Sequence, residues 1–283
     1  MRFVSIEGRI HALSSTGDRG VDLGDLTGKD PGACKFLGSG GIEAAREALG
    51  AAGPGTALEG VGLDAPVPKP RMIWAIGLNY LDHIAEQKAE IPDVPTVFVK
   101  SPRALIGHEA PIVIPPHVTR PDYEGELAFV ISRRCKDVPE SDALDVVAGV
   151  TCAHDVSARD HQRATTQWSW SKSFDTFCPM GPALVTLDEL PGLDLAIETR
   201  INGEVMQSSN TKEMVFSIAR LVAHLSRGVT LDAGDVVLTG TPGGVGFARK
   251  PPRWLQDGDV VEVEIEGVGT LRNPVVRREG EPA

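Results

Sequence analysis

The stretch Pro121-Asp-Tyr-Glu124-Gly-Glu126-Leu-Ala-Phe-Val-Ile131 joins two carboxylates to an unbroken apolar run. An unbroken run predicts a strand that is buried on both faces, because a strand with one wet face would alternate. Glu124 and Glu126 are two residues apart, so they face the same side and their Cα atoms lie about 7 Å apart. Two glutamates at this spacing can reach one Mg²⁺ or Mn²⁺ ion, which prefer oxygen ligands. By itself, such a pair is more often a solvated strand face than a metal site.

A second predicted strand, 146–152, runs into His154 and Asp155. Neighbouring residues of a strand point to opposite faces, so these two side chains cannot easily reach one ion together. Since the ion prefers oxygen, Asp155 is predicted as the third ligand.

The remaining pattern predicts a mainly β fold with some α structure. A hairpin is expected around Gly8-Arg9, and helices are expected at 42–52, 80–88 and 213–227. In the last of these, Asn210 and Glu213 are predicted to cap the helix and Gly228 to stop it. Further strands are predicted at 72–76, 96–100, 112–114, 126–131, 195–201, 236–239 and 260–265.

The segment from Gly50 to Pro70 is dense in Gly, Ala and Pro, which disfavours regular structure and predicts a domain boundary. We therefore expect a small N-terminal domain at 1–69, a catalytic domain at 70–278 and a tail at 279–283.

The chain has 283 residues and a formal net charge of −11, which argues against nucleic-acid binding. A negatively charged substrate would need cationic side chains close to the carboxylates. The four cysteines form no C-x-x-C pair and are predicted to be reduced thiols. The N-terminus does not resemble a signal peptide, and no apolar run approaches the ~20 residues of a membrane span. A cytoplasmic protein without membrane contacts is expected.

Six ordered motifs resemble the fumarylacetoacetate hydrolase family, and the resemblance runs from about Met72 to Val276. They are IGLNYLDHIAE at 76–86, DYEGELAFVI at 122–131, HDVSARDHQ at 154–162, KSFDTFCPMGP at 172–182, LTGTPGGVG at 238–246 and DGDVVEVEIEGVG at 257–269. The resemblance implies a mixed β-sandwich or β-roll of the family's catalytic type.

The resemblance also implies roles for individual residues. It places Mg²⁺ or Mn²⁺ on Glu124, Glu126 and Asp155. It implies that His83 and Glu86 activate water and that Lys172 faces the substrate's developing negative charge. The implied substrate contacts are Arg159 and Gln162, with Tyr80 and Thr241 as weaker candidates. The family commonly forms homodimers, which we expect here.

The function implied by this resemblance is hydrolysis of a carbon–carbon bond in a small, anionic diketo-acid or acylpyruvate. The segments 206–216 and 247–255 resemble a bacterial branch containing 2,4-diketo-3-deoxy-sugar-acid hydrolases and oxaloacetate decarboxylases. The same enolate also forms by loss of CO₂ or by movement of a proton. An oxaloacetate-type decarboxylase, a 2-hydroxy-diene-dioate isomerase and a non-catalytic family member are therefore the alternatives.

Overall fold

The computed structural model describes residues 1–280. The α-helices are α1 Leu23–Thr27, α2 Ala33–Gly38, α3 Gly41–Leu49, α4 Leu81–Gln87, α5 Arg159–Gln162 and α6 Ile218–Gly228. The strands of the first half are β1 Arg2–Ile6, β2 Arg9–Leu13, β3 Arg19–Asp22, β4 Thr56–Ala57, β5 Ile73–Gly77, β6 Thr96–Lys100, β7 Leu105–Ile106, β8 Ile112–Ile114, β9 Pro121–Asp122 and β10 Gly125–Ile131. Those of the second half are β11 Val147–His154, β12 Ser157–Ala158, β13 Cys178–Val185, β14 Ala196–Ile201, β15 Glu204–Asn210, β16 Val236–Leu238, β17 Val260–Ile265 and β18 Gly269–Arg277.

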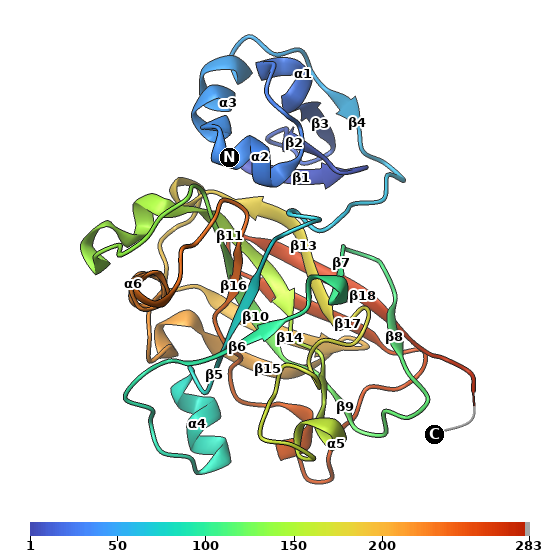
Figure 1. Ribbon diagram of the computed structural model, residues 1–283. Coiled ribbons are helices and arrows are strands. Elements are labelled where there is room, and N and C mark those ends of the chain that lie inside the picture. Colours follow the sequence, from blue (N-terminus) through green and yellow to red (C-terminus); the bar gives the residue numbers. More distant parts are fainter. Residues whose placement is uncertain (281–283) are drawn as a thin grey trace.

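Most strands belong to two sheets (Figure 1). The larger sheet runs in the order β4-β3-β2-β1-β13-β11-β10-β16-β5-β6, and the five-stranded sheet runs β15-β14-β17-β18-β8. Both contain parallel and antiparallel pairs, and β10 contacts β14 across the two sheets. The predicted fold class, mainly β with some α, is confirmed. Among residues 1–280, no helix has the length and apolar character that a bilayer crossing requires.

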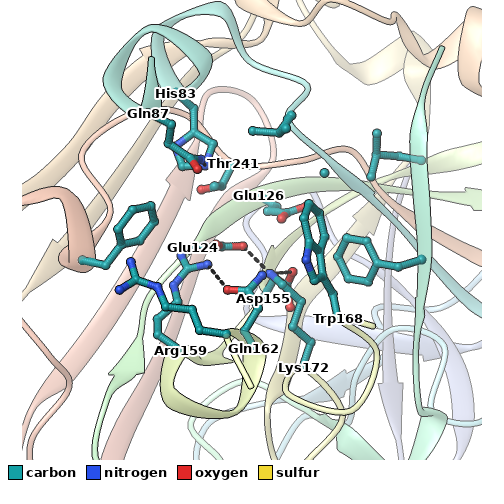
Figure 2. Close-up of a pocket in the computed structure, with 16 residues that line it drawn as sticks. His83, Gln87, Glu124, Glu126, Asp155, Arg159, Gln162, Trp168, Lys172 and Thr241 are labelled. Atoms are coloured by element: carbon teal, nitrogen blue, oxygen red, sulfur yellow. Dashed lines mark hydrogen bonds and ion pairs between the residues drawn. The ribbon is translucent and has the colours of Figure 1, made fainter. Parts of the chain in front are cut away.

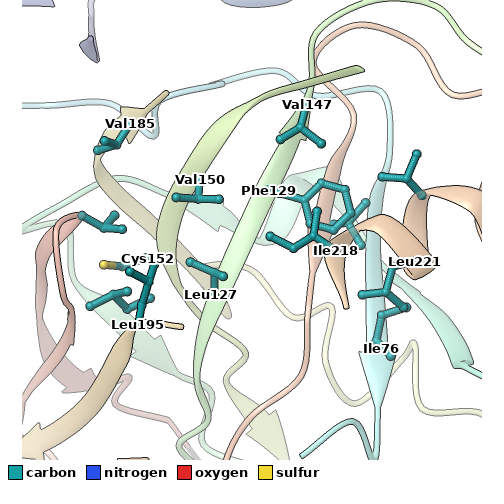
Figure 3. Close-up of a cluster of buried hydrophobic side chains, with 14 of the residues drawn as sticks. Ile76, Leu127, Phe129, Val147, Val150, Cys152, Val185, Leu195, Ile218 and Leu221 are labelled. Atoms are coloured by element: carbon teal, nitrogen blue, oxygen red, sulfur yellow. The ribbon is translucent and has the colours of Figure 1, made fainter. Parts of the chain in front are cut away.

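The apolar core lies between these sheets and the helix α6 (Figure 3). Leu127 and Phe129 extend from β10, Val150 extends from β11, and Leu221 comes from α6. All four side chains are fully buried. Each such side chain contributes about 2 kcal/mol of hydrophobic stabilisation, so this core holds the strand ends that carry the polar site.

Every residue of β10 is buried, as its continuous apolar pattern predicts. The strand pairs with β11 on one side and β16 on the other. The antiparallel register places Gly125 opposite His154 and Glu126 opposite Ala153. Beyond the ladder, the Asp155 N–H donates to the Glu124 carbonyl at 2.9 Å. This pairing brings two segments about 30 residues apart in sequence together at one end of these strands.

The N-terminal part shares the larger sheet with the rest of the chain. The predicted hairpin is present, and Glu7 and Gly8 take positive φ values of 49° and 76° at its turn. The strand β1 pairs with β13, so that Phe3 lies opposite Leu184. Residues 1–69 form the upper part of Figure 1, and the domain boundary near residue 70 stays a prediction.

The predicted start of the long helix is wrong. The helix α6 begins at Ile218, and the Ser217 side chain caps it by accepting the Arg220 N–H. Asn210 instead caps a short 3-10 turn at Thr211–Glu213. The reason is a long-range contact: Asn79 accepts the Phe216 N–H on its side chain at 2.8 Å and so holds this segment extended. The strands that the sequence did not predict are β3, β4, β7, β9, β12, β13, β15 and β18.

Candidate active site

Three carboxylates meet where two neighbouring interior strands of the larger sheet, β10 and β11, begin and end. Glu124 and Glu126 flank the start of β10, and Asp155 follows the end of β11. One oxygen from each lies within 4.8 Å of the others, and all three residues are buried (Figure 2). His154 does not join this group; burial and the nearby charge of Lys100 lower the pKa of its ring to about 3. The structure therefore brings together the three ligands that the spacing and the resemblance predict.

Gly125 separates the two glutamates for a steric reason. A Cβ atom at this position would collide with the side-chain oxygen of Thr199 on β14. The absence of a side chain lets β10 approach the second sheet closely at this point. Gly125 also donates its N–H to the Gln207 side chain at 2.9 Å, which fixes the backbone between Glu124 and Glu126.

Three buried cations surround the carboxylates. The Lys172 ammonium donates to Glu124 Oε2 at 2.7 Å and to Asp155 Oδ2 at 2.5 Å. The Arg159 guanidinium donates to Glu124 as well. Lys100, which was not among the predicted site residues, donates to Asp155 Oδ1 at 2.5 Å. These side chains supply the local positive charge that an acidic chain needs in order to bind an anion.

These contacts fix the protonation states of Glu124 and Lys172. Burial would raise the pKa of Glu124, but the charges of Arg159 and Lys172 outweigh it and hold the pKa well below its ordinary value. Burial likewise would lower the pKa of Lys172, yet Asp155 and Glu124 raise it. A carboxylate and an ammonium group are therefore both charged at neutral pH.

Glu126 differs from the other two ligands. Among residues 1–280 it has no ion-pair partner, although one oxygen accepts the Gly240 N–H at 2.7 Å. Burial and the charges of Asp155 and Glu124 raise the pKa of Glu126. A bound cation would offset the repulsion between Glu126 and the other two carboxylates.

The donor set fits a divalent metal ion. The buried charged side chains of the site are four acids and three bases, which leaves one negative charge in excess: Asp122, Glu124, Glu126, Asp155, Lys100, Arg159 and Lys172. Buried charge of this kind needs a compensating cation or proton. The three converging carboxylates would hold Mg²⁺ or Mn²⁺, because these ions bind hard oxygen ligands.

A cavity of about 220 Å³ opens over the carboxylates (Figure 2). The predicted residues that line it are His83, Glu124, Glu126, Asp155, Arg159, Gln162, Lys172 and Thr241. Glu86 contacts His83 behind this lining. Tyr80 does not line the cavity: it is fully buried in the apolar core, where burial raises the pKa of its hydroxyl. The structure therefore places Tyr80 in the core beneath the site and not in the lining of the cavity.

The helix α4 covers one side of this cavity and carries His83. Glu86 accepts from His83 Nδ1 at 3.3 Å with one oxygen and from the Gly244 N–H at 3.0 Å with the other. At the start of the helix, Asp82 accepts the Ser209 hydroxyl at 2.5 Å. The histidine is thus oriented by a carboxylate that is itself fixed by the Gly-rich loop.

The Gly-rich loop 239–246 positions Thr241 beside the carboxylates. The Thr241 hydroxyl donates to the Gly125 carbonyl at 2.9 Å and accepts from Gln207 Nε2 at 2.8 Å. Gln207 is buried and holds both the loop and the start of β10. Sequence reasoning missed Gln207, although it lies in the polar segment 206–216 that resembles the bacterial branch.

Arg159 is held by a second buried acid that sequence reasoning also missed. Asp122 accepts from Arg159 Nε at 2.8 Å and from the Gly246 N–H at 2.7 Å. Gln162 accepts from Arg159 Nη1 at 2.8 Å, and the Phe247 ring stacks on the guanidinium at 4.5 Å. Asp122 lies two residues before Glu124, and this spacing could have identified it as a further acid of the site.

Trp168 and Gln87 also line the cavity without having been predicted to do so. Trp168 packs edge-on against Phe98 at 5.7 Å and forms an apolar wall. Gln87 follows His83 by one helical turn and contacts its ring.

Comparisons with known proteins identify the family of this chain. The model of the fumarylacetoacetate (FAA) hydrolase C-terminal family matches residues 72–276. The chain is 44% identical to the mitochondrial oxaloacetate tautomerase fahd2 of Xenopus laevis over 91% of this chain and 83% of that protein.

Two solved structures are similar over nearly the whole chain. The 5-carboxymethyl-2-hydroxymuconate delta-isomerase of Mycobacterium smegmatis has a TM-score of 0.79 and 37% identity, covering 99% of this chain and 100% of its own. The maleylpyruvate hydrolase of Sphingobium sp. SYK-6 has a TM-score of 0.83 and 32% identity, covering 98% and 100%. The predicted resemblance is confirmed, and this chain belongs to the fumarylacetoacetate hydrolase family of enzymes.

Proposed function

We propose that this enzyme binds a small 2-keto-dicarboxylic acid on a divalent cation and interconverts its keto and enol forms, with oxaloacetate as the representative substrate. The observation that carries the proposal is the buried group of Glu124, Glu126 and Asp155 beside the Lys172 ammonium. The similarity to an oxaloacetate tautomerase supports the same reaction.

The charges at the cavity suit an acid with two carboxylates. Lys172 and Arg159 lie at its base, among the metal-site carboxylates. Arg163 lines the cavity and stacks on Phe247 at 5.5 Å, so a third cation is available for a distal carboxylate. A volume of about 220 Å³ favours a small substrate.

When bound, a divalent cation would act as a Lewis acid toward the oxygens of a chelated keto-acid. In enolisation a proton leaves the carbon next to the keto group, the electron pair moves toward the keto oxygen, and a proton adds there. Lys172 is protonated and lies against Glu124 and Asp155, where it stabilises the negative charge that develops. Trp168 and Phe98 limit the access of water from one side.

Hydrolysis of a carbon–carbon bond in an acylpyruvate is the second candidate, and the His83–Glu86 contact favours it. In that reaction His83 takes a proton from water and the water oxygen bonds to the carbonyl carbon. The carbon–carbon bond then breaks, and its electron pair stays on the leaving enolate, which is protonated. The similarity to a maleylpyruvate hydrolase supports this candidate.

A substrate panel tests both candidates. Oxaloacetate, acylpyruvates, diketo-sugar acids and 2-hydroxy-diene-dioates would be assayed with Mg²⁺, with Mn²⁺ and after chelation. Enol absorbance reports tautomerisation, and product mass separates decarboxylation and hydrolysis from isomerisation. We expect metal-dependent tautomerisation of oxaloacetate that Glu126→Ala abolishes. Full activity of the Glu126→Ala protein, or no metal-dependent turnover of any acid, would contradict the proposal.

We also propose that the enzyme is a homodimer, as the family resemblance implied. One exposed aromatic residue supports this: Trp170 is 65% exposed and packs edge-on against the buried ring of Phe174 at 5.3 Å. Light scattering at several protein concentrations tests the proposal, and a monomer at all of them would refute it. The cytoplasmic location stays a prediction.

A further inference from the structure

We infer that Gln87 determines the reaction specificity of this site by occupying the His83 ring nitrogen that would otherwise activate water. The inference rests on the proposed function, in which enolisation requires no nucleophilic water. It makes Gln87 a positioning residue that acts through His83. Its removal should favour hydrolysis.

Both ring nitrogens of His83 have partners. Gln87 Nε2 lies 2.6 Å from His83 Nε2, while Glu86 Oε2 lies 3.3 Å from His83 Nδ1. Figure 2 shows His83 and Gln87 in contact on the side of the cavity above Thr241. The resemblance alone implied that the second nitrogen would be available to a water molecule.

The Glu86 carboxylate decides which nitrogen carries the proton. A carboxylate has no hydrogen to donate, so His83 Nδ1 must donate to it. In the neutral ring, Nε2 is then an acceptor and takes a hydrogen from the Gln87 amide. If the amide were turned around, its oxygen would instead accept from a protonated Nε2. In both arrangements the lone pair that would remove a proton from water is occupied.

The contact between His83 and Gln87 forms within the single helix α4. His83 and Gln87 are four residues apart, so they lie on the same face of α4. The helix is held at Asp82 by Ser209 and at Glu86 by Gly244, so the backbone under both side chains is fixed. Gln87 itself is exposed. Replacing it therefore leaves the buried packing of α4 unchanged.

The consequence differs for the two reactions. Hydrolysis requires His83 Nε2 to accept the water proton while the water oxygen forms its bond to carbon. Enolisation needs stabilisation of an enolate, which Lys172 supplies and a bound cation would increase, and it forms no bond to water. The amide on Nε2 therefore suppresses hydrolysis more than enolisation.

The test compares the two reactions in Gln87→Met, in which a side chain of similar length lacks the amide. Initial rates of acylpyruvate hydrolysis and oxaloacetate tautomerisation would be measured on the same Mg²⁺-loaded protein. We expect the ratio of hydrolysis to tautomerisation to rise about tenfold, since a freed general base contributes at least that factor. Ala85→Met adds the same side chain to an exposed position of α4 and should leave the ratio unchanged.

A double variant and a spectroscopic measurement show whether His83 carries the effect. In His83→Ala/Gln87→Met the ratio should not rise above that of His83→Ala. In ¹⁵N-histidine-labelled protein, Gln87→Met should shift the His83 Nε2 resonance more than the Nδ1 resonance. An unchanged ratio, an equal rise in the double variant or an unmoved Nε2 resonance would overturn the inference.

These outcomes separate the inference from the function on which it rests. If the wild-type enzyme does not tautomerise oxaloacetate, the proposed function fails, and the hydrolysis rate and Nε2 resonance still report on Gln87. The other outcome is that the enzyme tautomerises oxaloacetate while Gln87→Met changes neither the ratio of hydrolysis to tautomerisation nor the His83 Nε2 resonance. In that case only the role of Gln87 is refuted.

Discussion

At the scale of single residues, the site is a balance of buried charges in which Glu126 is the unpaired member. Lys172 and Arg159 neutralise Glu124, whereas Glu126 receives a backbone N–H from Gly240 and, among the described residues, no cation from the chain. A buried carboxylate without a cation binds a proton more tightly. Metal and proton should therefore compete for Glu126.

We predict that Mg²⁺ raises the melting temperature more at about pH 8 than at about pH 6. The raised pKa of Glu126 means that the metal-free folded state holds its proton more tightly than the unfolded chain does. Its contribution to stability is present below the ordinary glutamate pKa and is lost as pH rises through the raised value. A metal ion that replaces the proton restores stability over that interval. Differential scanning fluorimetry with and without Mg²⁺ measures the effect.

Glu126→Gln is the matched control because it removes the ionisable group and keeps its shape. Its metal-free melting temperature should fall less between the same two pH values, and Mg²⁺ should stabilise it little. The prediction fails if the wild-type response to Mg²⁺ is the same at both pH values.

Lys100 is a second informative residue, because its side chain and that of Asp155 are both 0% exposed. We predict that Lys100→Met lowers the free energy of unfolding of the metal-free protein by about 3 kcal/mol, since it leaves a buried carboxylate with one partner fewer. Urea unfolding measures it. Lys35→Met removes an exposed partner of Asp30 and should change stability little. Equal unfolding midpoints for the two variants would contradict the prediction.

At the scale of secondary-structure elements, the site depends on how closely β10 approaches β14. Gly125 allows this approach, and the Thr199 hydroxyl that faces it has no hydrogen-bond partner among the described residues. The two glutamates move with this segment of backbone. A change in the spacing between the strands should therefore alter metal binding.

We predict that Gly125→Ala weakens Mg²⁺ binding at least about tenfold and lowers stability by about 2 kcal/mol, as overpacking does. Thr199→Ala alone should have a small effect, because its hydroxyl makes no hydrogen bond with any residue of 1–280. In the double variant the added methyl group no longer meets that oxygen, so part of the affinity should return. Calorimetric titration with Mg²⁺ measures each protein. Additive effects of the two substitutions would count against the steric explanation.

At the scale of the whole molecule, the N-terminal part and the catalytic part share a sheet and a core. The strand β1 pairs with β13 across the predicted boundary. Phe3 and Phe36 pack in one apolar cluster with Ala128 and Val130 of the site-bearing strand β10. Separation of the two parts would expose this cluster to water.

We therefore predict that the metal-free protein unfolds in one cooperative transition in urea. All four tryptophans lie after residue 70, so fluorescence reports only the catalytic part, whereas far-ultraviolet circular dichroism reports both parts. The two signals should have the same midpoint. A distinct earlier transition seen by circular dichroism alone would show that residues 1–69 unfold independently.

The sequence by itself determined the features that depend on neighbouring residues. The apolar run of β10 specified a strand buried on both faces, and the spacing of Glu124 and Glu126 placed both carboxylates on one side of it. The strand predicted at 260–265 is likewise present as β17, in which Val261, Val263 and Ile265 are buried. The ordered motifs identified the family, because six short patterns in sequence order carry more information than any one of them.

The tertiary structure alone decided the features that depend on distant residues. Lys100 reaches Asp155 across 55 residues, and Asn79 holds Phe216 across 137 residues, which delays the start of α6. Periodicity and capping rules describe a chain only over a few turns or strands, so they contain no signal for these contacts. Gln87 is different: it is local to His83, but its role emerged only when the folded helix placed the amide on the ring nitrogen inside the cavity.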